Sequence, residues 1–189
     1  MTDSPHHWPT ALWSRGLLAI AIVVVGSIVI GALTSPAQQY LPVWINSLAN
    51  SAGGWSMFAF LLVWLSRARR VQGAILGAAS FVLMVQSYEF VTALRGFPAP
   101  APFTSIWILV GLVAGPIIGI AAALTRYASR PWAIVGVAAL SCVLFAEGTY
   151  GLAVVSNTTS PAYWVIELVL GAGFLVIAII RTRGRRATG

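Results

Sequence analysis

Three of the four acidic residues of this chain, Glu89, Glu147 and Glu167, lie inside long apolar stretches. A carboxylate at membrane depth costs a few kcal/mol even on the most lenient insertion scale, so such residues normally face the interior of a helix bundle. Counted at about 1.5 Å per residue from the nearest predicted helix end, each lies roughly 9 to 14 Å below the same outer side. If their helices are neighbours, the three carboxylates form one acidic layer that opens outward.

Each of these carboxyl groups also has a polar neighbour about one helical turn away on its own helix. The pairs are Gln86 with Glu89, Tyr150 with Glu147, and Tyr163 with Glu167. Hydrogen bonds from such groups lower the desolvation cost of a carboxyl, while repulsion between carboxylates at one depth favours a shared proton or a bound cation. Arg95 follows Glu89 closely and is the candidate counter-charge at the mouth of the pocket.

Several interpretations of the three glutamates stay open. In the first, they line an outward-facing acidic pocket that binds or transports a small solute or a cation. In the second, each is protonated or paired and only joins helices together. A third, an intramembrane enzyme with paired glutamates as acid and base, requires two carboxyl groups near one substrate. A protein without enzymatic activity is favoured, and no catalytic residue is predicted.

The composition explains why these glutamates are placed in a membrane. Apolar residues make up 59% of the 189 residues and charged residues only 8%, against about 25% charged residues in soluble domains. Six spans of about 20 residues use nearly the whole chain and leave no separate soluble domain. We therefore predict an all-α polytopic membrane bundle with six transmembrane helices in residues 15–180, between a tail at 1–14 and a basic tail at 181–189.

Apolar runs predict five of the six helices directly, at residues 16–33, 71–94, 103–124, 132–155 and 162–180. The second helix is harder to place, because its apolar run at residues 55–65 is too short to span unless the helix begins near Asn46. A short or discontinuous helix is the alternative. In the connection before it, apolar residues at helical spacing predict a short helix at the membrane interface.

The arginines predict the orientation. The chain has no lysine and a net charge of +7. Assigned to alternate sides of the membrane, ten arginines fall on the side of the two termini and Arg95 alone on the opposite side. Positive residues accumulate in cytoplasmic loops, so both termini are predicted to be cytoplasmic. This topology accounts for the basic charge without a nucleic-acid partner.

Small residues mark two helix faces that are suited to close packing. Gly111, Gly115 and Gly119 repeat every four residues in one predicted helix, and Gly73 and Gly77 do so in another. Such faces let helix backbones approach closely. We expect this packing within the chain; in the alternative, the protein is a non-catalytic subunit or scaffold that binds another membrane protein through these faces.

Motifs for metals and cofactors are not found. The only histidines, His6 and His7, lie in the N-terminal tail, and no HExxH, phosphate-loop or GxSxG pattern occurs. We therefore predict no metal site and no cofactor, and partners limited to the lipid bilayer, a small solute or cation, or another membrane protein.

Two segments carry a resemblance to a known family. Residues 46–60, read as Asn-Ser-Leu-Ala-Asn-Ser-Ala-Gly-Gly-Trp-Ser-Met-Phe-Ala-Phe, and the Ala146-Glu147-Gly148 step resemble an uncharacterised family of bacterial six-helix membrane proteins, one of the domains of unknown function. Residues 62–64 are bulkier than the glycine-containing stretch expected there. The resemblance implies six helices and a multi-pass protein of the bacterial inner membrane. It carries no catalytic residue.

Overall fold

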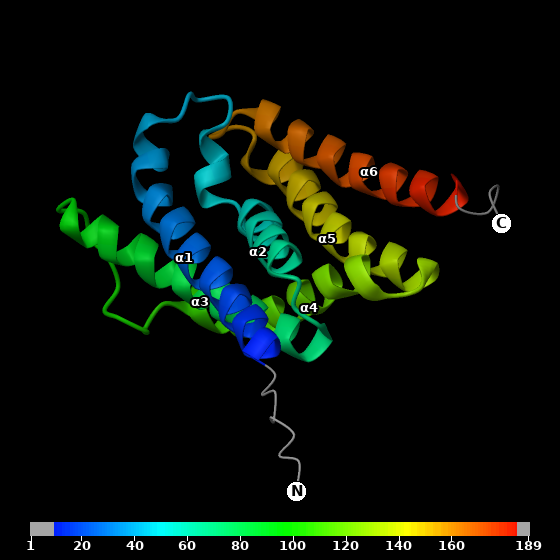
Figure 1. Ribbon diagram of the computed structural model, residues 1–189. Coiled ribbons are helices and arrows are strands. Elements are labelled where there is room, and N and C mark those ends of the chain that lie inside the picture. The colour runs from blue at the N-terminus through cyan, green and yellow to red at the C-terminus, as the bar shows by residue number, and fades with distance from the viewer. Residues whose placement is uncertain (1–9, 185–189) are drawn as a thin grey trace, which may run out of the picture.

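The computed structural model describes residues 10–184, which form six α-helices joined by short connections (Figure 1). They are α1 (Thr10–Tyr40), α2 (Ala52–Ser66), α3 (Arg70–Leu94), α4 (Ile106–Tyr127), α5 (Arg130–Tyr150) and α6 (Pro161–Gly184). A 3-10 helix, η1 (Asn46–Asn50), precedes α2, and a π-helical turn, η2 (Gly151–Val155), follows α5. The described residues contain no strand, so the all-helical class is confirmed.

Five of the described helices are long and apolar enough to cross a membrane: α1, α3, α4, α5 together with η2, and α6. Their boundaries follow the predicted apolar runs closely, except that α1 continues to Tyr40. Many large apolar side chains on these helices are exposed. Because soluble monomers rarely expose so much contiguous apolar surface, the exposed helix faces indicate a membrane protein.

The short second helix begins later than expected. Instead of an α-helix from near Asn46, the structure has η1 at Asn46–Asn50, and α2 begins only at Ala52. The Ser51 side chain caps α2, because its Oγ accepts a hydrogen bond from the Gly54 backbone N–H at 2.8 Å. With 15 residues, α2 rises about 22 Å, less than the roughly 30 Å of a bilayer core.

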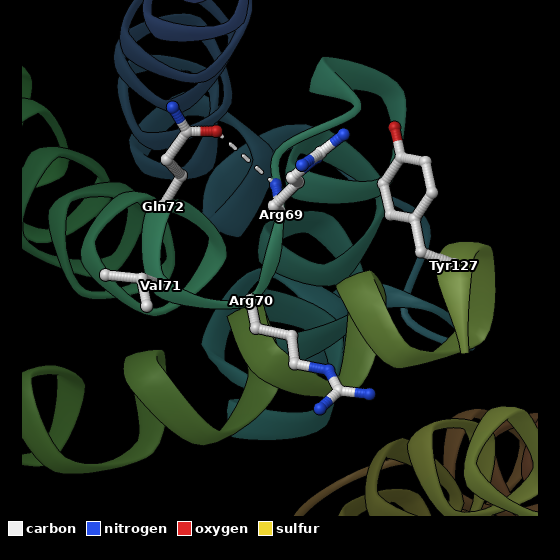
Figure 2. Close-up of a pocket in the computed structure, with 5 residues that line it drawn as sticks. All are labelled: Arg69, Arg70, Val71, Gln72 and Tyr127. Carbon is white, nitrogen blue, oxygen red and sulfur yellow. Dashed lines mark hydrogen bonds between the residues drawn. The ribbon is translucent and has the colours of Figure 1, made fainter. Parts of the chain in front are cut away.

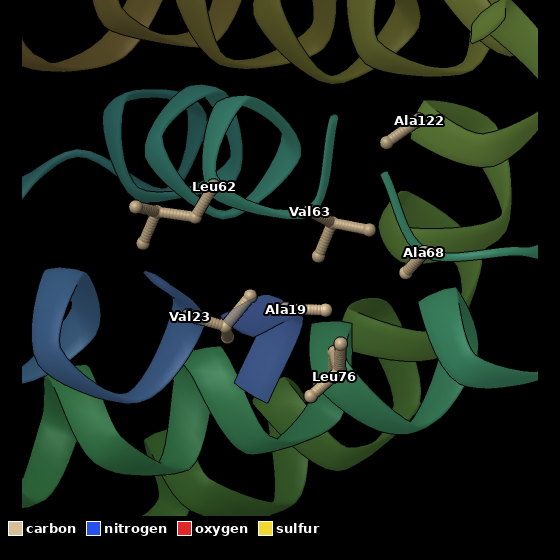
Figure 3. Packing of buried hydrophobic residues seen from close by; sticks show 7 residues of the cluster. All are labelled: Ala19, Val23, Leu62, Val63, Ala68, Leu76 and Ala122. Carbon is tan, nitrogen blue, oxygen red and sulfur yellow. The ribbon is translucent and has the colours of Figure 1, made fainter. Parts of the chain in front are cut away.

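α2 is nevertheless the central helix of the bundle. Its Leu62 and Val63 pack with buried residues from α1, α3 and α4 and from the turn after α2 (Figure 3). The full set in this cluster is Ala19, Val23, Leu62, Val63, Ala68, Leu76 and Ala122. On another side of α2, Ala59 packs with α3, α4 and α5 through residues such as Met84 and Leu144. α6 lies outside this core and packs chiefly against α5.

α3 and α4 cross in close backbone contact at their glycines. A Cβ atom on Gly73 would lie 2.7 Å from the carbonyl oxygen of Gly119, and one on Gly115 would lie 2.6 Å from Cα of Ala78. Gly77 faces Gly115 and Gly119 in the same way. Gly111 lies against Phe81, where an added Cβ would be 2.6 Å from that residue's Cβ. The small-residue faces thus pack against each other inside the chain.

The predicted tails fall largely outside the described residues. Residues 1–9 and 185–189 are not described, whereas residues 10–14 already belong to α1 and α6 continues to Gly184.

Candidate functional site

Consecutive helices α5 and α6 bring Glu147 and Glu167 to the same level of the bundle. The two helices run side by side (Figure 1), so the last turn of α5 lies near the first turns of α6. Small residues permit the close approach: a Cβ on Gly148 would lie 2.9 Å from the Leu168 side chain, and Gly151 lies directly against the Trp164 indole. The Ser141 hydroxyl adds a hydrogen bond to the Gly171 carbonyl at 2.9 Å.

The Glu147 carboxylate caps the N-terminus of α2. Its Oε1 accepts a hydrogen bond from the Ala52 backbone N–H at 2.9 Å, and its Oε2 accepts one from the Gly53 N–H. The first N–H groups of a helix have no partner within the helix, and the helix dipole places partial positive charge there. The carboxylate therefore satisfies two donors that have no other partner in the helix, and its negative charge is stabilised in return.

Ser51 joins the two glutamates. Its hydroxyl oxygen lies 2.9 Å from Oε2 of Glu147 and 3.3 Å from Oε1 of Glu167. The same oxygen accepts hydrogen bonds from the Gly54 N–H and, at 2.6 Å, from the Tyr163 hydroxyl. A serine hydroxyl has one proton to donate. It therefore serves one carboxylate at a time, and the shorter distance favours Glu147.

This hydrogen-bond pattern leaves Glu167 short of partners. The residue is 0% exposed, and its Oε2 is buried without any hydrogen-bond partner. A buried polar atom without a partner costs about 1–3 kcal/mol, and more when it carries charge. Among the described side chains, no arginine forms an ion pair with either carboxylate; Arg95 instead donates to Ser35 Oγ at 2.8 Å and to Gln39. The pair thus holds acceptor capacity that no positive side chain among the described residues satisfies.

Gly53 makes room for the two carboxylates. A Cβ atom at this position would collide with Oε1 of Glu167 and lie 2.8 Å from Oε2 of Glu147. Any side chain here would push the carboxylates away from the start of α2. Of the residues around the pair, Glu147 is half-buried and Ala52 is exposed, whereas Glu167 is buried.

The α5 helix changes its geometry directly after Glu147. The Gly151 N–H bonds to the carbonyl groups of both Glu147 and Gly148, and the next turn, η2, is π-helical. Single π-turns inside α-helices are rare and occur frequently at functional sites.

The structure brings together only part of the predicted set. Glu147, Glu167 and Tyr163 meet around Ser51, with Tyr163 donating to the serine rather than pairing along its own helix. Tyr150 is 58% exposed on α5, and its hydroxyl forms no hydrogen bond with a side chain or backbone group of the described residues.

Glu89, Gln86 and Arg95 lie in another part of the bundle, because α3 packs chiefly against α1 and α4. Glu89 is buried and accepts a hydrogen bond from Gln86 Nε2 at 2.8 Å. Gln86 in turn accepts one from the Phe103 N–H at 3.2 Å. Glu89 therefore has its own partner.

Ser51 and Gly53 were not among the predicted site residues. The local sequence does contain a signal for them. Ser51 stands three residues before Gly54, whose N–H it caps, and the Gly53-Gly54 pair leads into an apolar run. Both also fall inside the residue 46–60 segment that carries the family resemblance.

Comparisons with known proteins agree with that resemblance. A search of curated proteins and of solved structures finds no match. Residues 10–189 match a family of unknown function (DUF6518), which covers almost the entire chain. The chain therefore belongs to this family of unknown function.

Proposed function

We propose that this chain is a multi-pass protein of the bacterial inner membrane that binds one small positive ion at Glu147 and Glu167. The ion is a proton in the resting state and is exchanged for a small hard cation such as Na⁺. The observation that carries the proposal is the buried, partnerless Oε2 of Glu167 beside a second carboxylate.

The charge balance of the site supports one positive ion. The α2 N-terminus supplies roughly half an elementary charge, enough to help one carboxylate but not two. Glu147 receives the two backbone N–H groups, so its carboxylate oxygens already have donors from the chain. Glu167 has no comparable donors and lies beside that negative charge. An added proton or cation at Glu167 removes the repulsion and gives its oxygen a partner.

The donor atoms favour a hard ion. Oxygen atoms from two carboxylates gather at the site, and carboxylate oxygens bind hard cations.

The position of the site supports access from one side of the membrane. Glu167 follows Pro161, the first residue of α6, by six residues, which places the start of α2 roughly 9 Å along that helix. Adding the roughly 22 Å of α2 gives about the thickness of the bilayer core. We propose that α2 begins inside the membrane and ends at the arginine-rich side. By the positive-inside rule that side is cytoplasmic, so the site opens outward.

A scaffold role through the glycine faces receives less support from the geometry. Gly73, Gly77, Gly115 and Gly119 already contact one another's helices, so these faces are occupied within the chain.

Ion exchange can be tested on the purified full-length protein in detergent. NaCl, KCl and LiCl are added in turn to a weakly buffered sample, and the release of protons is followed by a pH indicator dye. We expect about one proton per chain for the cation that binds, because cation and proton compete for the same oxygen atoms. Glu167→Gln should release none. Glu89→Gln, which changes a buried glutamate with its own partner, should behave as the wild type. No release with any of the three salts, or equal release from the Glu167→Gln variant, would overturn the proposal.

A further inference from the structure

A basic cleft lies at the end of α2 that is remote from the glutamate site. It has a volume of about 720 Å³ and is lined by Arg69, Arg70, Val71, Gln72 and Tyr127. Figure 2 shows Arg69 and Arg70 at the turn that leads into α3, with Tyr127 projecting from α4. None of these residues belongs to the carboxylate site.

Hydrogen bonds fix Tyr127 and Gln72 at the edge of the cleft, whereas its two arginine side chains are exposed. The Tyr127 hydroxyl donates a hydrogen bond to the Arg67 carbonyl oxygen at 2.8 Å, which fixes the ring beside the turn. Gln72 Oε1 accepts from the Arg69 backbone N–H at 3.5 Å. By contrast, the side chains of Arg69 and Arg70 are exposed, and neither forms an ion pair with a described residue.

Within residues 10–184, no acidic side chain lies near this end of the bundle. The carboxylates of the described residues are Glu89, Glu147 and Glu167, all in the opposite half of the bundle. The neighbouring Arg126 is already engaged, since it donates to the Trp64 carbonyl at 3.0 Å and lies 4.6 Å from the centre of the Trp64 ring. Arg69 and Arg70 therefore remain for an external anion. Planar guanidinium groups bind phosphate through paired hydrogen bonds, and α3 begins at this point, so the positive end of its dipole also favours an anion here.

An apolar surface leads away from the cleft along α3. Val71 lines the cleft and is 75% exposed, and Ile75, one turn further along α3, is 64% exposed. Both lie in a helix that is long and apolar enough to span a membrane. A ligand that matches both parts has a negatively charged phosphate and a hydrocarbon chain.

We propose that this cleft binds an anionic phospholipid, with the phosphate between Arg69 and Arg70 and an acyl chain along Val71 and Ile75. The site does not depend on the carboxylate pair. A free phosphate would satisfy the arginines and leave the apolar surface unused. The phosphate chemistry is common to both ligands, and the apolar surface favours the lipid.

The test uses the full-length protein in nanodiscs and in detergent. Lipid binding is measured by native mass spectrometry with phosphatidylglycerol and, as a zwitterionic reference, phosphatidylcholine. Each basic residue near an anionic lipid surface contributes about a five-fold effect, so Arg69→Gln with Arg70→Gln should weaken phosphatidylglycerol binding about 25-fold. Arg181→Gln removes one positive charge at an exposed arginine outside the cleft. It is the control for Arg69→Gln or Arg70→Gln alone, each of which should weaken binding about five-fold, and it should itself leave binding nearly unchanged.

Two further arms separate the alternatives. Inorganic phosphate at about 1 mM, which would half-occupy a site with a Kd of that size, should not displace the lipid. Displacement would instead identify a site for free phosphate. Equal binding by the double variant and the wild type would overturn the proposal. A loss in the Arg181→Gln control as large as in a single cleft variant would also overturn it. Such a result would show general attraction of the lipid to the basic surface and no defined site.

Discussion

Tyr163 on α6 donates a hydrogen bond of 2.6 Å to Ser51, the residue that caps α2. This contact joins the outermost helix of the bundle to the start of the central one. Because the same serine oxygen contacts Glu147 and Glu167, the helix cap and the acidic pair form a single hydrogen-bond network. A change in Ser51, Glu147 or Tyr163 therefore affects both the stability of α2 and the properties of the site.

The two glutamates should respond differently to the same substitution. In Glu147→Gln the carbonyl oxygen can still accept one N–H of α2, but the amide nitrogen then faces the other N–H. We expect a loss of about 1–3 kcal/mol in unfolding free energy. Glu167→Gln keeps the volume and removes a poorly paired carboxyl, so its effect should lie within about 0.5 kcal/mol of zero or be stabilising. Unfolding in detergent, followed by tryptophan fluorescence, measures both. A larger loss in Glu167→Gln than in Glu147→Gln would contradict this assignment of roles.

Gly53→Ala should abolish ion exchange at the acidic pair. The added Cβ would displace Glu167 and crowd Glu147, so the carboxylates could not approach the start of α2 together. The dye assay described for the proposed function gives the readout. Gly173→Ala is the control, because a Cβ there meets nothing within 4 Å. Proton release from Gly53→Ala equal to that of the wild type would show that the close approach is unnecessary.

Tyr163→Phe should destabilise the protein by about 1 kcal/mol, because it removes one buried hydrogen bond. The aromatic ring remains, including its edge contact with Trp164 at 4.9 Å between centroids. Tyr150→Phe removes an exposed hydroxyl from the neighbouring helix and should leave the unfolding free energy unchanged. The pair can be compared by thermal unfolding in the same detergent, and equal shifts in the two variants would argue against the Ser51 contact.

Gly77→Leu should prevent the packing of α3 against α4. The new side chain would meet the backbone of Gly115, which cannot move aside as a flexible side chain can. Overpacking of this kind costs about 1–3 kcal/mol or more, and we expect little monodisperse protein by size-exclusion chromatography. Gly16→Leu introduces the same side chain where a Cβ has no neighbour within 4 Å. Normal yield and elution of Gly77→Leu would contradict the backbone contact.

The outward opening of the site can be tested by thiol labelling. Ala52 is exposed beside Glu147, so in a Cys142→Ser background Ala52→Cys should react with a membrane-impermeant maleimide added outside intact cells. Val113→Cys, exposed in the apolar middle of α4, should remain unlabelled in the bilayer. Labelling of Ala52→Cys only after the cells are opened would place the site on the cytoplasmic side.

Hydropathy predicted the long helices well, because each span of about 20 apolar residues must satisfy its backbone hydrogen bonds within itself. The boundaries of α3, for example, were expected at residues 71–94 and are found at Arg70–Leu94. The start of α2 was not predictable in this way. It depends on Ser51 and on a carboxylate from α5, and both lie outside the apolar run of α2.

The membership of the site was only partly predictable for a related reason. Spacing along one helix puts Tyr163 about one turn from Glu167, but it cannot say that both contact Ser51 at the start of α2. Nor can it separate Glu89 from the other two glutamates. All three have the same local pattern, and only the packing of α3 away from α5 and α6 distinguishes them.

The sparse packing of α6 has a mechanical consequence. This helix is attached mainly to α5 and η2, and it also contacts η1 and the Ser51 network and packs Phe174 against the core cluster that contains Leu144. Binding of an ion at the acidic pair and the attachment of α6 to the start of α2 therefore depend on the same side chains. A ligand that binds the oxygen atoms of Glu167 must weaken or strengthen the attachment of α6 to the rest of the bundle.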